Sequence, residues 1–329
     1  MAVFYSDEVS CGDSFGASMS LIPITHLMPV RNGEEFLAKS LRDIQEAIDC
    51  SDEILVINDG SNDSTAALLA EAQNSYGNLR VVTTNGVGLI GALRLGVELS
   101  KFDWIARWDV DDVYDLERMR VQRELITDGV AAIFSDYDFW IDGKISAGRV
   151  YSPIFPLATK LSLLYSQQTP HPAALINKKL LLQAGNYRED DYPAEDLGLW
   201  LRLSSIGKLV TVPQNLLHYR LSKESISARR REAILSKKNE LISNKKNWNL
   251  ENVDTELVRE FLGFKELPDS KYRQLLFHRN LAKALKLDLL DLSKESKRQL
   301  GFGIRKIKFL LPVLKLYYFQ LRRKIFRSA

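Results

Sequence analysis

The segment from Trp104 to Asp115 constrains the fold of this chain more than any other segment. It begins with apolar residues, as a strand entering a core does, and it ends with the neighbouring carboxylates of Asp109, Asp111 and Asp112. Like charges this close repel one another unless a cation lies among them. A divalent metal is the simplest such cation, because Mg²⁺ and Mn²⁺ prefer carboxylate oxygens. The alternative is an acidic turn that faces water, but acids at the end of a strand lie where open α/β sheets bind ligands.

Length and composition allow a sizeable core. A chain of 329 residues suffices for one large α/β domain with an appendage, or for two domains. Its 45% hydrophobic and 26% charged residues are typical of globular proteins. Cys11 and Cys50 are the only cysteines, so we expect no disulfide framework and a reducing compartment. Residues 1–20 lack the pattern of a secretory signal, and we therefore expect the protein in the cytoplasm.

Positive charge is concentrated at the C-terminal end. Residues 301–329 contain eight Lys and Arg and no Asp or Glu, so removing these eight charges from the overall +3 leaves −5 for residues 1–300. A mildly acidic body argues against nucleic acid as a partner. In the tail, basic residues alternate with bulky apolar ones, and Pro312 and Lys315 keep its apolar runs below the ~20 residues of a membrane span. The tail therefore predicts a helix on an anionic membrane surface; a helix packed on the body, or a dimer contact, is the alternative.

Apolar runs alternate with helical patterns through the first half of the chain, which predicts parallel strands joined by helices. This alternation weakens after the acidic cluster, which predicts a mixed sheet. The predicted strands are 21–30, 53–57, 79–83, 104–108, 131–137, 139–145 and 173–176. The predicted helices are 34–50, 65–76, 92–100, 116–127, 157–166, 178–184, 195–203, 229–246, 253–262 and 272–292.

The segment Gly86 to Gly91 matches the G-x-G-x-x-G pattern of dinucleotide-binding loops. Like such a loop, it follows a predicted strand and opens a helix. An NAD-dependent oxidoreductase is therefore one alternative. That fingerprint, however, belongs on the first turn of a nucleotide-binding half, and here it follows the third predicted strand. We favour the interpretation in which these glycines let the loop and helix pack closely beneath the sheet.

Several motifs occur in one order along the chain, and their spacing is more specific than any one of them. From about Ile24 to Ser227 the chain resembles a family-2 glycosyltransferase of the GT-A fold, of the bacterial polysaccharide or lipopolysaccharide type. This resemblance implies a Rossmann-like mixed α/β sheet with a C-terminal helical extension. The motifs are Pro29–Gly33, Glu53–Asp63, Gly88–Gly96, Ile105–Asp112, His171–Pro172, Glu195–Arg202 and Tyr219–Arg220.

Together, the resemblance and the composition of the two ends divide the chain into four parts. Residues 1–20 would be a flexible extension, and residues 21–228 the GT-A glycosyltransferase domain. Residues 229–299 would form the helical extension, and residues 300–329 the basic amphipathic tail that associates with the membrane.

The resemblance also implies a role for each matching site residue. Asp196 would be the general base, with Glu195 and Trp200 on the acceptor side. Helix capping and the helix dipole alone would also explain the two acids. Asp111 and Asp109 would hold Mn²⁺ or Mg²⁺. The donor would be bound by Pro29, Arg31, Asn32, Asp59, Gly88 and Asp109, with Asp59 hydrogen-bonded to its base.

Three positions depart from the family pattern. Arg31 stands where many relatives have Tyr, although a guanidinium can also stack on a base. Asn58 replaces the first acid of the usual Asp-Asp pair. Ser222 stands where relatives often have a His that could bind metal or phosphate. His171 and His218 are the candidates to replace that ligand, although we favour a structural role for each.

Together these expectations describe an inverting, metal-dependent hexosyl- or N-acetylhexosaminyl-transferase. Its donor would be a nucleotide sugar, with UDP favoured, and its acceptor a lipid-linked, lipopolysaccharide or capsule glycan. It would be peripheral on the inner face of the cytoplasmic membrane. A second alternative is a membrane-recruited binding module that keeps the fold without turnover.

Overall fold

The computed structural model describes residues 21–141, 144–145, 149–150, 152–153, 156–163, 169–222 and 225–243. The strands in these segments are β1 (Ile24–Val30), β2 (Glu53–Asp59), β3 (Leu79–Thr84), β4 (Trp104–Arg107), β5 (Val113–Tyr114), β6 (Val130–Ile141), β7 (Lys144–Ile145), β8 (Leu175–Asn177) and β9 (Lys208–Arg220). The helices are α1 (Leu37–Ala47), α2 (Thr65–Ser75), α3 (Gly88–Leu99), α4 (Arg118–Arg123), α5 (Pro156–Ser162), α6 (Lys178–Gln183), α7 (Glu195–Leu203), α8 (Ile226–Arg229) and α9 (Arg231–Ser243), with 3-10 turns η1 (His171–Ala173) and η2 (Glu189–Asp191).

All of these strands form one sheet in the order β3-β2-β1-β4-β8-β6-β9-β5, with β7 paired to β6. Strands β1 to β4 are parallel, with β1 between β2 and β4. Every residue of β1 and β2 is buried, as expected for strands covered on both faces. The C-terminal ends of these four strands therefore meet at one edge of the sheet.

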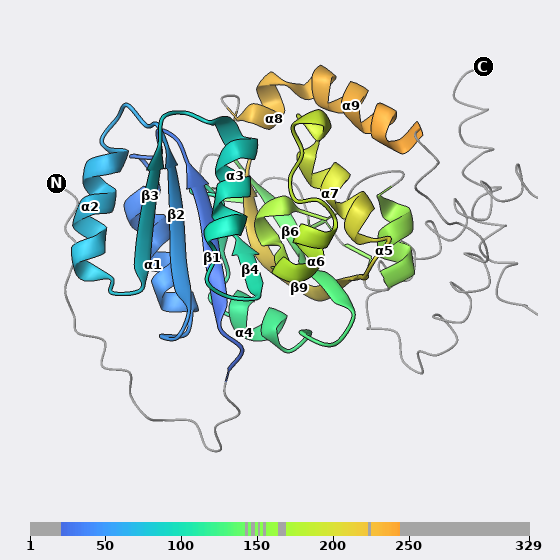
Figure 1. Ribbon diagram of the computed structural model, residues 1–329, viewed down its shortest axis with the longest axis horizontal. Coiled ribbons are helices and arrows are strands. Elements are labelled where there is room, and N and C mark those ends of the chain that lie inside the picture. The colour runs from blue at the N-terminus through green and yellow to red at the C-terminus, as the bar shows by residue number, and fades with distance from the viewer. Residues whose placement is uncertain are drawn as a thin grey trace, which may run out of the picture. The chain divides into compact units, whose positions relative to one another are not determined.

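Helices cover both faces of the sheet (Figure 1). Apolar side chains of α1, α2 and α4 pack on one face, and those of α3, α6 and α7 pack on the other. Alternate residues of a strand point to opposite faces. Accordingly, Ile54 and Val56 of β2 join the first core, while Leu55 and Ile57 join the second.

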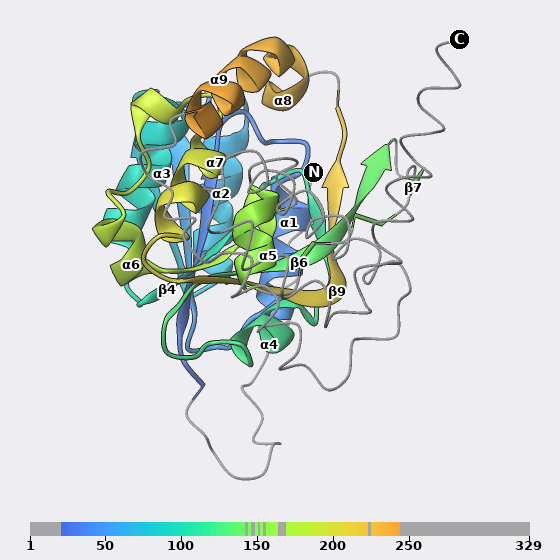
Figure 2. The same cartoon turned by 90° about the vertical axis from the view of Figure 1, so that its right-hand side faces the viewer.

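The second half of the sheet is mixed and bent. β8 is antiparallel to both β4 and β6, β6 is parallel to β9, and β9 is antiparallel to β5. β6 and β9 are long strands of 12 and 13 residues that run side by side (Figure 2). Their pairing is irregular near Val130 and again around Asp136. Such irregularities bend a strand and increase its twist.

The structure confirms the predicted mixed α/β sheet and corrects several of its elements. The strands predicted at 131–137 and 139–145 are one strand, β6, followed by the short β7. Strand β9 was not predicted, because Pro213 and its polar neighbours interrupt the apolar alternation. Helix α3 begins at Gly88 rather than Ala92, and α4 is shorter than predicted at both ends.

The predicted extension at 1–20, the helices at 253–262 and 272–292, and the basic tail at 300–329 lie outside the described residues. The domain boundaries therefore stay predictions. Within the described part of the chain, no helix is long and apolar enough to cross a bilayer.

Hydrogen bonds hold the β1–α1 loop against the β2–α2 loop. The amide of Asn32 donates to Ser61 Oγ at 2.9 Å, and the amide of Asn62 donates to Asn32 Oδ1 at 2.9 Å. The amide of Gly33 donates to Thr65 Oγ1 at 2.8 Å. Asn32 has a positive φ of 55°, a conformation that Asn adopts more readily than most residues. These contacts order the edge of the sheet where β1 and β2 end.

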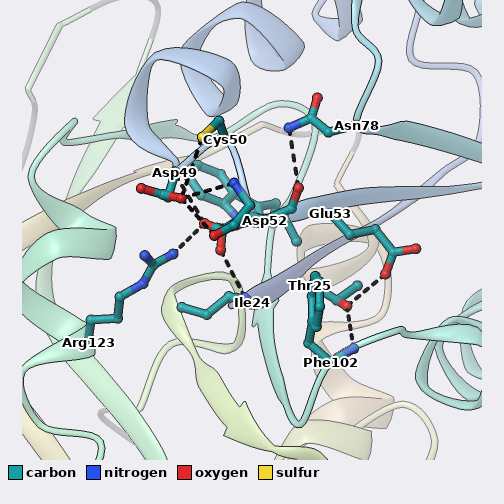
Figure 3. A network of polar contacts seen from close by, with 12 residues as sticks. Ile24, Thr25, Asp49, Cys50, Asp52, Glu53, Asn78, Phe102 and Arg123 are labelled. Atoms are coloured by element: carbon teal, nitrogen blue, oxygen red, sulfur yellow. Dashed lines mark hydrogen bonds and ion pairs between the residues drawn. The ribbon is translucent and has the colours of Figure 1, made fainter. Parts of the chain in front are cut away.

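The opposite edge is held by a buried polar network (Figure 3). Asp52, which precedes β2, accepts a hydrogen bond from the amide of Ile24 at 2.9 Å and forms an ion pair with Arg123. Glu53 Oε2 accepts the hydroxyl proton of Thr25 at 2.7 Å. The network therefore fixes the register of β1 and β2 where both strands begin.

Gly60 brings the β2–α2 loop against the β3–α3 loop. Its φ is +65°, and a Cβ at this position would lie 2.8 Å from the backbone nitrogen of Gly86. Gly129 also has a positive φ, +79°, but no atom would lie within 4 Å of its Cβ. Comparing substitutions at Gly60 and Gly129 therefore separates the cost of the left-handed backbone from the cost of a steric clash between the two loops.

We expect Gly129→Ala to lower the free energy of unfolding by about 1–2 kcal/mol, the usual cost of a left-handed backbone for an L-residue. Gly60→Ala should cost about 1–3 kcal/mol more, because its methyl group meets backbone that cannot rotate away. Urea denaturation of both variants measures the difference. Equal losses would show that the two loops separate without cost.

Candidate active site

Acidic side chains from three separate segments gather at the edge where β1 to β4 end. Asp59 is the last residue of β2, Asp109 follows β4, and Glu195 opens α7. The negative charge of Asp109 contributes to raising the pKa of Glu195, so the start of α7 lies near the loop after β4. This edge is where open α/β sheets bind ligands.

Asp59 holds the start of α3. Its Oδ1 accepts hydrogen bonds from Thr84 Oγ1 and from the amide of Val87, both at 2.6 Å, and its Oδ2 accepts from the amide of Gly88 at 2.9 Å. A dinucleotide-binding loop needs the free amides at this helix start for pyrophosphate. Here a carboxylate of the protein occupies them, which argues against the NAD-dependent alternative.

The remaining residues predicted to bind the donor differ in exposure. Arg31 is exposed, and its Nη1 lies 4.0 Å from where a Cβ of Gly86 would be. Asn32 is exposed, but its side-chain oxygen accepts a hydrogen bond within the loops. Pro29 is buried within β1, opposite Ile57. Arg31 is therefore the side chain of this loop that is best placed to meet a ligand.

Arg107 and Tyr114 fix the position of Asp109. Arg107 Nη2 donates to Asp109 Oδ1 at 2.6 Å, and the amide of Asp109 donates to the hydroxyl oxygen of Tyr114 at 2.7 Å. The Arg107 side chain is 3% exposed, whereas that of Asp109 is 33% exposed. One oxygen of Asp109 is thus paired with a buried cation, while the carboxylate still reaches the surface.

Arg118 supports this loop from below. It is fully buried, and its guanidinium carbon lies 4.4 Å from the ring centre of Trp108 and 4.8 Å from that of Tyr114. Its Nη2 donates to the carbonyl oxygen of Arg107 at 2.9 Å. Burial lowers the pKa of Arg118 to about 10, which leaves it charged at neutral pH. Cation–π contacts without water are among the stronger ones.

Burial and mutual repulsion perturb the next two acids. Burial, followed by the charge of Asp109, raises the pKa of Asp111 to about 6. The pKa of Asp112 is raised well above its ordinary value, by burial first and then by the charges of Asp109 and Asp111. Asp112 Oδ1 accepts the amide proton of Arg220 at 2.8 Å, but its Oδ2 has no hydrogen-bond partner in the described segments. A nearby cation would lower these pKa values.

Asp109 and Asp111 fit a divalent cation that is shared with a diphosphate. Among the described residues, no three His, Cys, Asp or Glu side chains form a metal site on their own. Mg²⁺ nevertheless usually takes only one or two protein carboxylates and completes its shell with phosphates and water. The two aspartates supply oxygens of the type that it prefers.

The first turn of α7 carries two acids in different environments. Glu195 is 9% exposed, and its Oε2 is buried without a hydrogen-bond partner in the described part of the chain. Burial, followed by the charge of Asp196, raises the pKa of Glu195 to about 7. Asp196 is half-buried, and its Oδ1 accepts the amide proton of Leu197 at 2.7 Å. Burial, followed by the charge of Asp196, raises the pKa of Tyr137 to about 12, so β6 passes near this turn.

Trp200 corrects one prediction. It was expected on the acceptor side, but its side chain is fully buried, with its ring centre 4.8 Å from that of Phe134 and 5.8 Å from that of His171. A fully enclosed side chain cannot contact an acceptor, so Trp200 belongs to the core beneath α7.

Both candidate histidines have partners within the protein. His171 is buried, and its Nε2 lies 2.7 Å from the hydroxyl of Tyr187. Burial lowers the pKa of His171 well below its ordinary value, which keeps it neutral. His218 Nδ1 lies 2.6 Å from Asp138 Oδ1. These contacts support the structural interpretation of both residues.

Sequence reasoning missed the residues that support the acids. Arg107 had a detectable signal, because a cation within an apolar strand and two residues before Asp109 needs a partner. Tyr137 had none, because its proximity to the first turn of α7 depends on how β6 bends.

Known proteins with similar sequences are glycosyltransferases. Residues 25–181 match the model of the family described as glycosyl transferase family 2. The amylovoran biosynthesis glycosyltransferase AmsE of Erwinia amylovora is 26% identical, over 70% of this chain and 82% of its own. A protein of Haemophilus influenzae named as an uncharacterized glycosyltransferase is 25% identical, over 60% of this chain and 65% of its own. This match spans slightly less than two thirds of the Haemophilus protein.

Similar solved structures support the same fold. TarS of S. aureus in complex with UDP-GlcNAc has a TM-score of 0.57 and 14% identity, covering 80% of this chain and 81% of its own. The mannosyltransferase PcManGT of Pyrobaculum calidifontis, in complex with GDP-Man and Mn²⁺, has a TM-score of 0.50 and 16% identity, covering 91% and 84%. At these identities the likeness shows the fold alone.

The raised pKa of Glu195 predicts a pH-dependent effect of Glu195→Gln on stability. The folded protein binds the Glu195 proton more tightly than the unfolded chain, so the stability that this proton contributes is present at low pH and is lost as the pH rises through about 7. The amide does not titrate. From pH 5 to pH 8 the free energy of unfolding of Glu195→Gln should therefore rise by about 1–3 kcal/mol relative to wild type. Urea denaturation at both pH values measures this, with the exposed Glu189→Gln as the control. A constant difference would contradict the assigned burial.

Proposed function

The chain belongs to glycosyl transferase family 2 and has the GT-A fold, and from this we propose that it is an inverting, metal-dependent glycosyltransferase. Its donor is a nucleotide sugar, with UDP favoured, and its acceptor a glycan or a lipid-linked glycan. The observation that supports the proposal is the position of Asp59 and Asp109 at the C-terminal ends of β2 and β4, with Glu195 within reach of the Asp109 charge. AmsE, whose name places it in amylovoran biosynthesis, supports a polysaccharide acceptor.

On the donor side, Asp59 and Arg31 recognise the base. Each carboxylate oxygen can accept two hydrogen bonds, so Oδ2 of Asp59 keeps room for an N–H group of uracil beside the amide of Gly88. Arg31 is exposed and stacks on the base with its planar guanidinium. Pro29 and Asn32 shape the loop that carries Arg31.

Asp109 and Asp111 would hold Mn²⁺ or Mg²⁺ together with the donor diphosphate. When bound, the cation supplies positive charge that stabilises the departing diphosphate. Arg107 keeps one oxygen of Asp109 in a fixed direction. A support of this kind is needed, because a catalytic carboxylate displaced by about 1 Å loses much of its effect.

Asp196 is the general base. The acceptor hydroxyl oxygen bonds to the anomeric carbon as the bond from that carbon to the diphosphate oxygen breaks, and the hydroxyl proton passes to the Asp196 carboxylate. Attack opposite the leaving group inverts the anomeric centre. Asp196 lies in the first turn of α7, where the helix dipole favours its ionised form.

We also propose that the basic tail at 300–329 attaches the protein to the inner face of the cytoplasmic membrane. The eight basic residues without an acidic one support this, because anionic lipid attracts each such charge by about 1 kcal/mol.

Asp196→Asn tests the proposed reaction. We expect kcat to fall about 10²- to 10⁴-fold, because the amide cannot accept the proton. The Kd of the donor should change little. Transfer and hydrolysis are measured with UDP-GlcNAc, UDP-glucose, UDP-galactose and GDP-mannose in the presence of Mn²⁺, using the exposed Asp190→Asn as the control. Retained turnover in Asp196→Asn would refute the assignment of the base, and a wild-type protein inactive on all four donors would count against the reaction.

Asp111→Ala tests the metal site. Wild type should bind UDP more tightly with Mn²⁺ than without it, because Asp111 would hold a cation that attracts the diphosphate. In the variant the two affinities should become equal. Calorimetric titration measures both, and Asp128→Ala, an exposed acid away from this loop, serves as the control. An undiminished effect of Mn²⁺ in Asp111→Ala would contradict the metal role.

A further inference from the structure

Glu195 combines three properties that a structural carboxyl rarely has together. Its side chain is almost completely buried, its Oε2 has no hydrogen-bond partner within the described segments, and it opens α7 beside Asp196. Buried polar atoms in folded proteins nearly always have a partner. An unpartnered buried oxygen costs stability, so this atom indicates a place that a ligand completes.

Glu195 is adjacent to Asp196 in the chain and is also reached by the charge of Asp109, so it lies near both halves of the proposed site. Burial, the charge of Asp196 and, more weakly, the charge of Asp109 raise the pKa of Glu195, and the charge of Arg107 lowers it. In the proposed function, Asp109 lies beside the diphosphate and Asp196 beside the acceptor hydroxyl. The group that lies between a diphosphate and an acceptor hydroxyl is the sugar being transferred.

We propose that the Glu195 carboxyl hydrogen-bonds a hydroxyl group of the transferred sugar and thereby selects among donors. This inference rests on the proposed function. It refines the expectation that Glu195 lies on the acceptor side, since the charge of Asp109, which belongs to the proposed donor half, also reaches Glu195.

Glu195 is suited to read a hydroxyl because both of its protonation states can do so. The ionised carboxylate accepts a hydrogen bond, and the protonated carboxyl also donates one. A site built to bond a hydroxyl strongly rejects an analogue that lacks it, because the protein group is then left unpaired. Glu195 would therefore contribute to specificity rather than to proton transfer.

The test is a binding cycle measured by calorimetry with Mn²⁺. The ligands are UDP, UDP-GlcNAc, and analogues of UDP-GlcNAc that lack the 3-, 4- or 6-hydroxyl. For wild type, one of these analogues should bind about 10- to 100-fold more weakly than UDP-GlcNAc, as expected for a hydrogen bond to a charged group. Glu195→Ala should bind UDP-GlcNAc more weakly than wild type does, by a similar factor. Its affinity for that analogue should equal its affinity for UDP-GlcNAc, and its affinity for UDP should equal that of wild type.

Two controls separate this role from a structural one. Glu195→Gln keeps a donor and an acceptor, so it should restore most of the affinity for UDP-GlcNAc, and Glu189→Ala should behave as wild type. If Glu195→Ala loses the same factor with every analogue, or binds UDP-GlcNAc as tightly as wild type does, the inference is wrong.

Failure of the proposed function is recognised separately. If the binding cycle gives the expected dependence on Glu195 and on one hydroxyl but the wild-type protein transfers no sugar, the proposed reaction is refuted and the hydrogen bond from Glu195 to the sugar is still supported. If wild type does not bind UDP-GlcNAc, the cycle is run with UDP-galactose, UDP-glucose or GDP-mannose and the matching deoxy analogues. Binding of none of the four would refute both.

Discussion

The position of the acidic loop depends on a hydrogen bond that is buried beneath it. Trp108 Nε1 donates to His26 Nδ1 at 3.0 Å, and because an indole nitrogen can only donate, His26 Nδ1 must be the acceptor. His26 Nε2 then donates to Asp52 Oδ2 at 3.1 Å. Burial lowers the pKa of His26, which keeps the ring neutral, as this arrangement requires. These two hydrogen bonds connect Asp52, at the start of β2, to Trp108, the residue directly before Asp109.

The acids of the site are held at a cost in stability that a ligand would relieve. Burial and mutual repulsion raise the pKa of Asp111, Asp112 and Glu195 together. Such clusters of perturbed carboxyl groups are typical of functional sites. The buried cation of Arg107 offsets only part of this charge, because it is already paired with Asp109. Without a ligand, the buried and mutually repelling carboxyl groups therefore lower the stability of the protein, and a bound cation would relieve this repulsion.

The sequence predicted the parts of the fold that depend on local pattern. The mostly apolar runs of β1 and β2 and the helices that follow them were visible, and the GT-A fold followed from the order of the motifs. β9 was hidden because Pro213 interrupts its alternation. The acceptor role of Trp200 was wrong because periodicity does not distinguish an exposed stripe from a buried one. The contacts of Asp59 with α3 were also invisible, since they depend on how two loops meet across the sheet edge.

The end of β9 connects the sheet edge that carries the acidic residues to the chain that follows. The amide of Arg220 is bonded to Asp112, and its guanidinium carbon lies 4.2 Å from the ring centre of Phe36, just before α1. Arg220 is also the last residue of the strand that leads to α8 and α9. A force on the polypeptide beyond Arg220 would act on Asp112 through this hydrogen bond. The geometry of the carboxylates and the path of the chain after β9 are thus linked through the hydrogen bond from the Arg220 amide to the Asp112 carboxylate and through the pairing of β5 with β9.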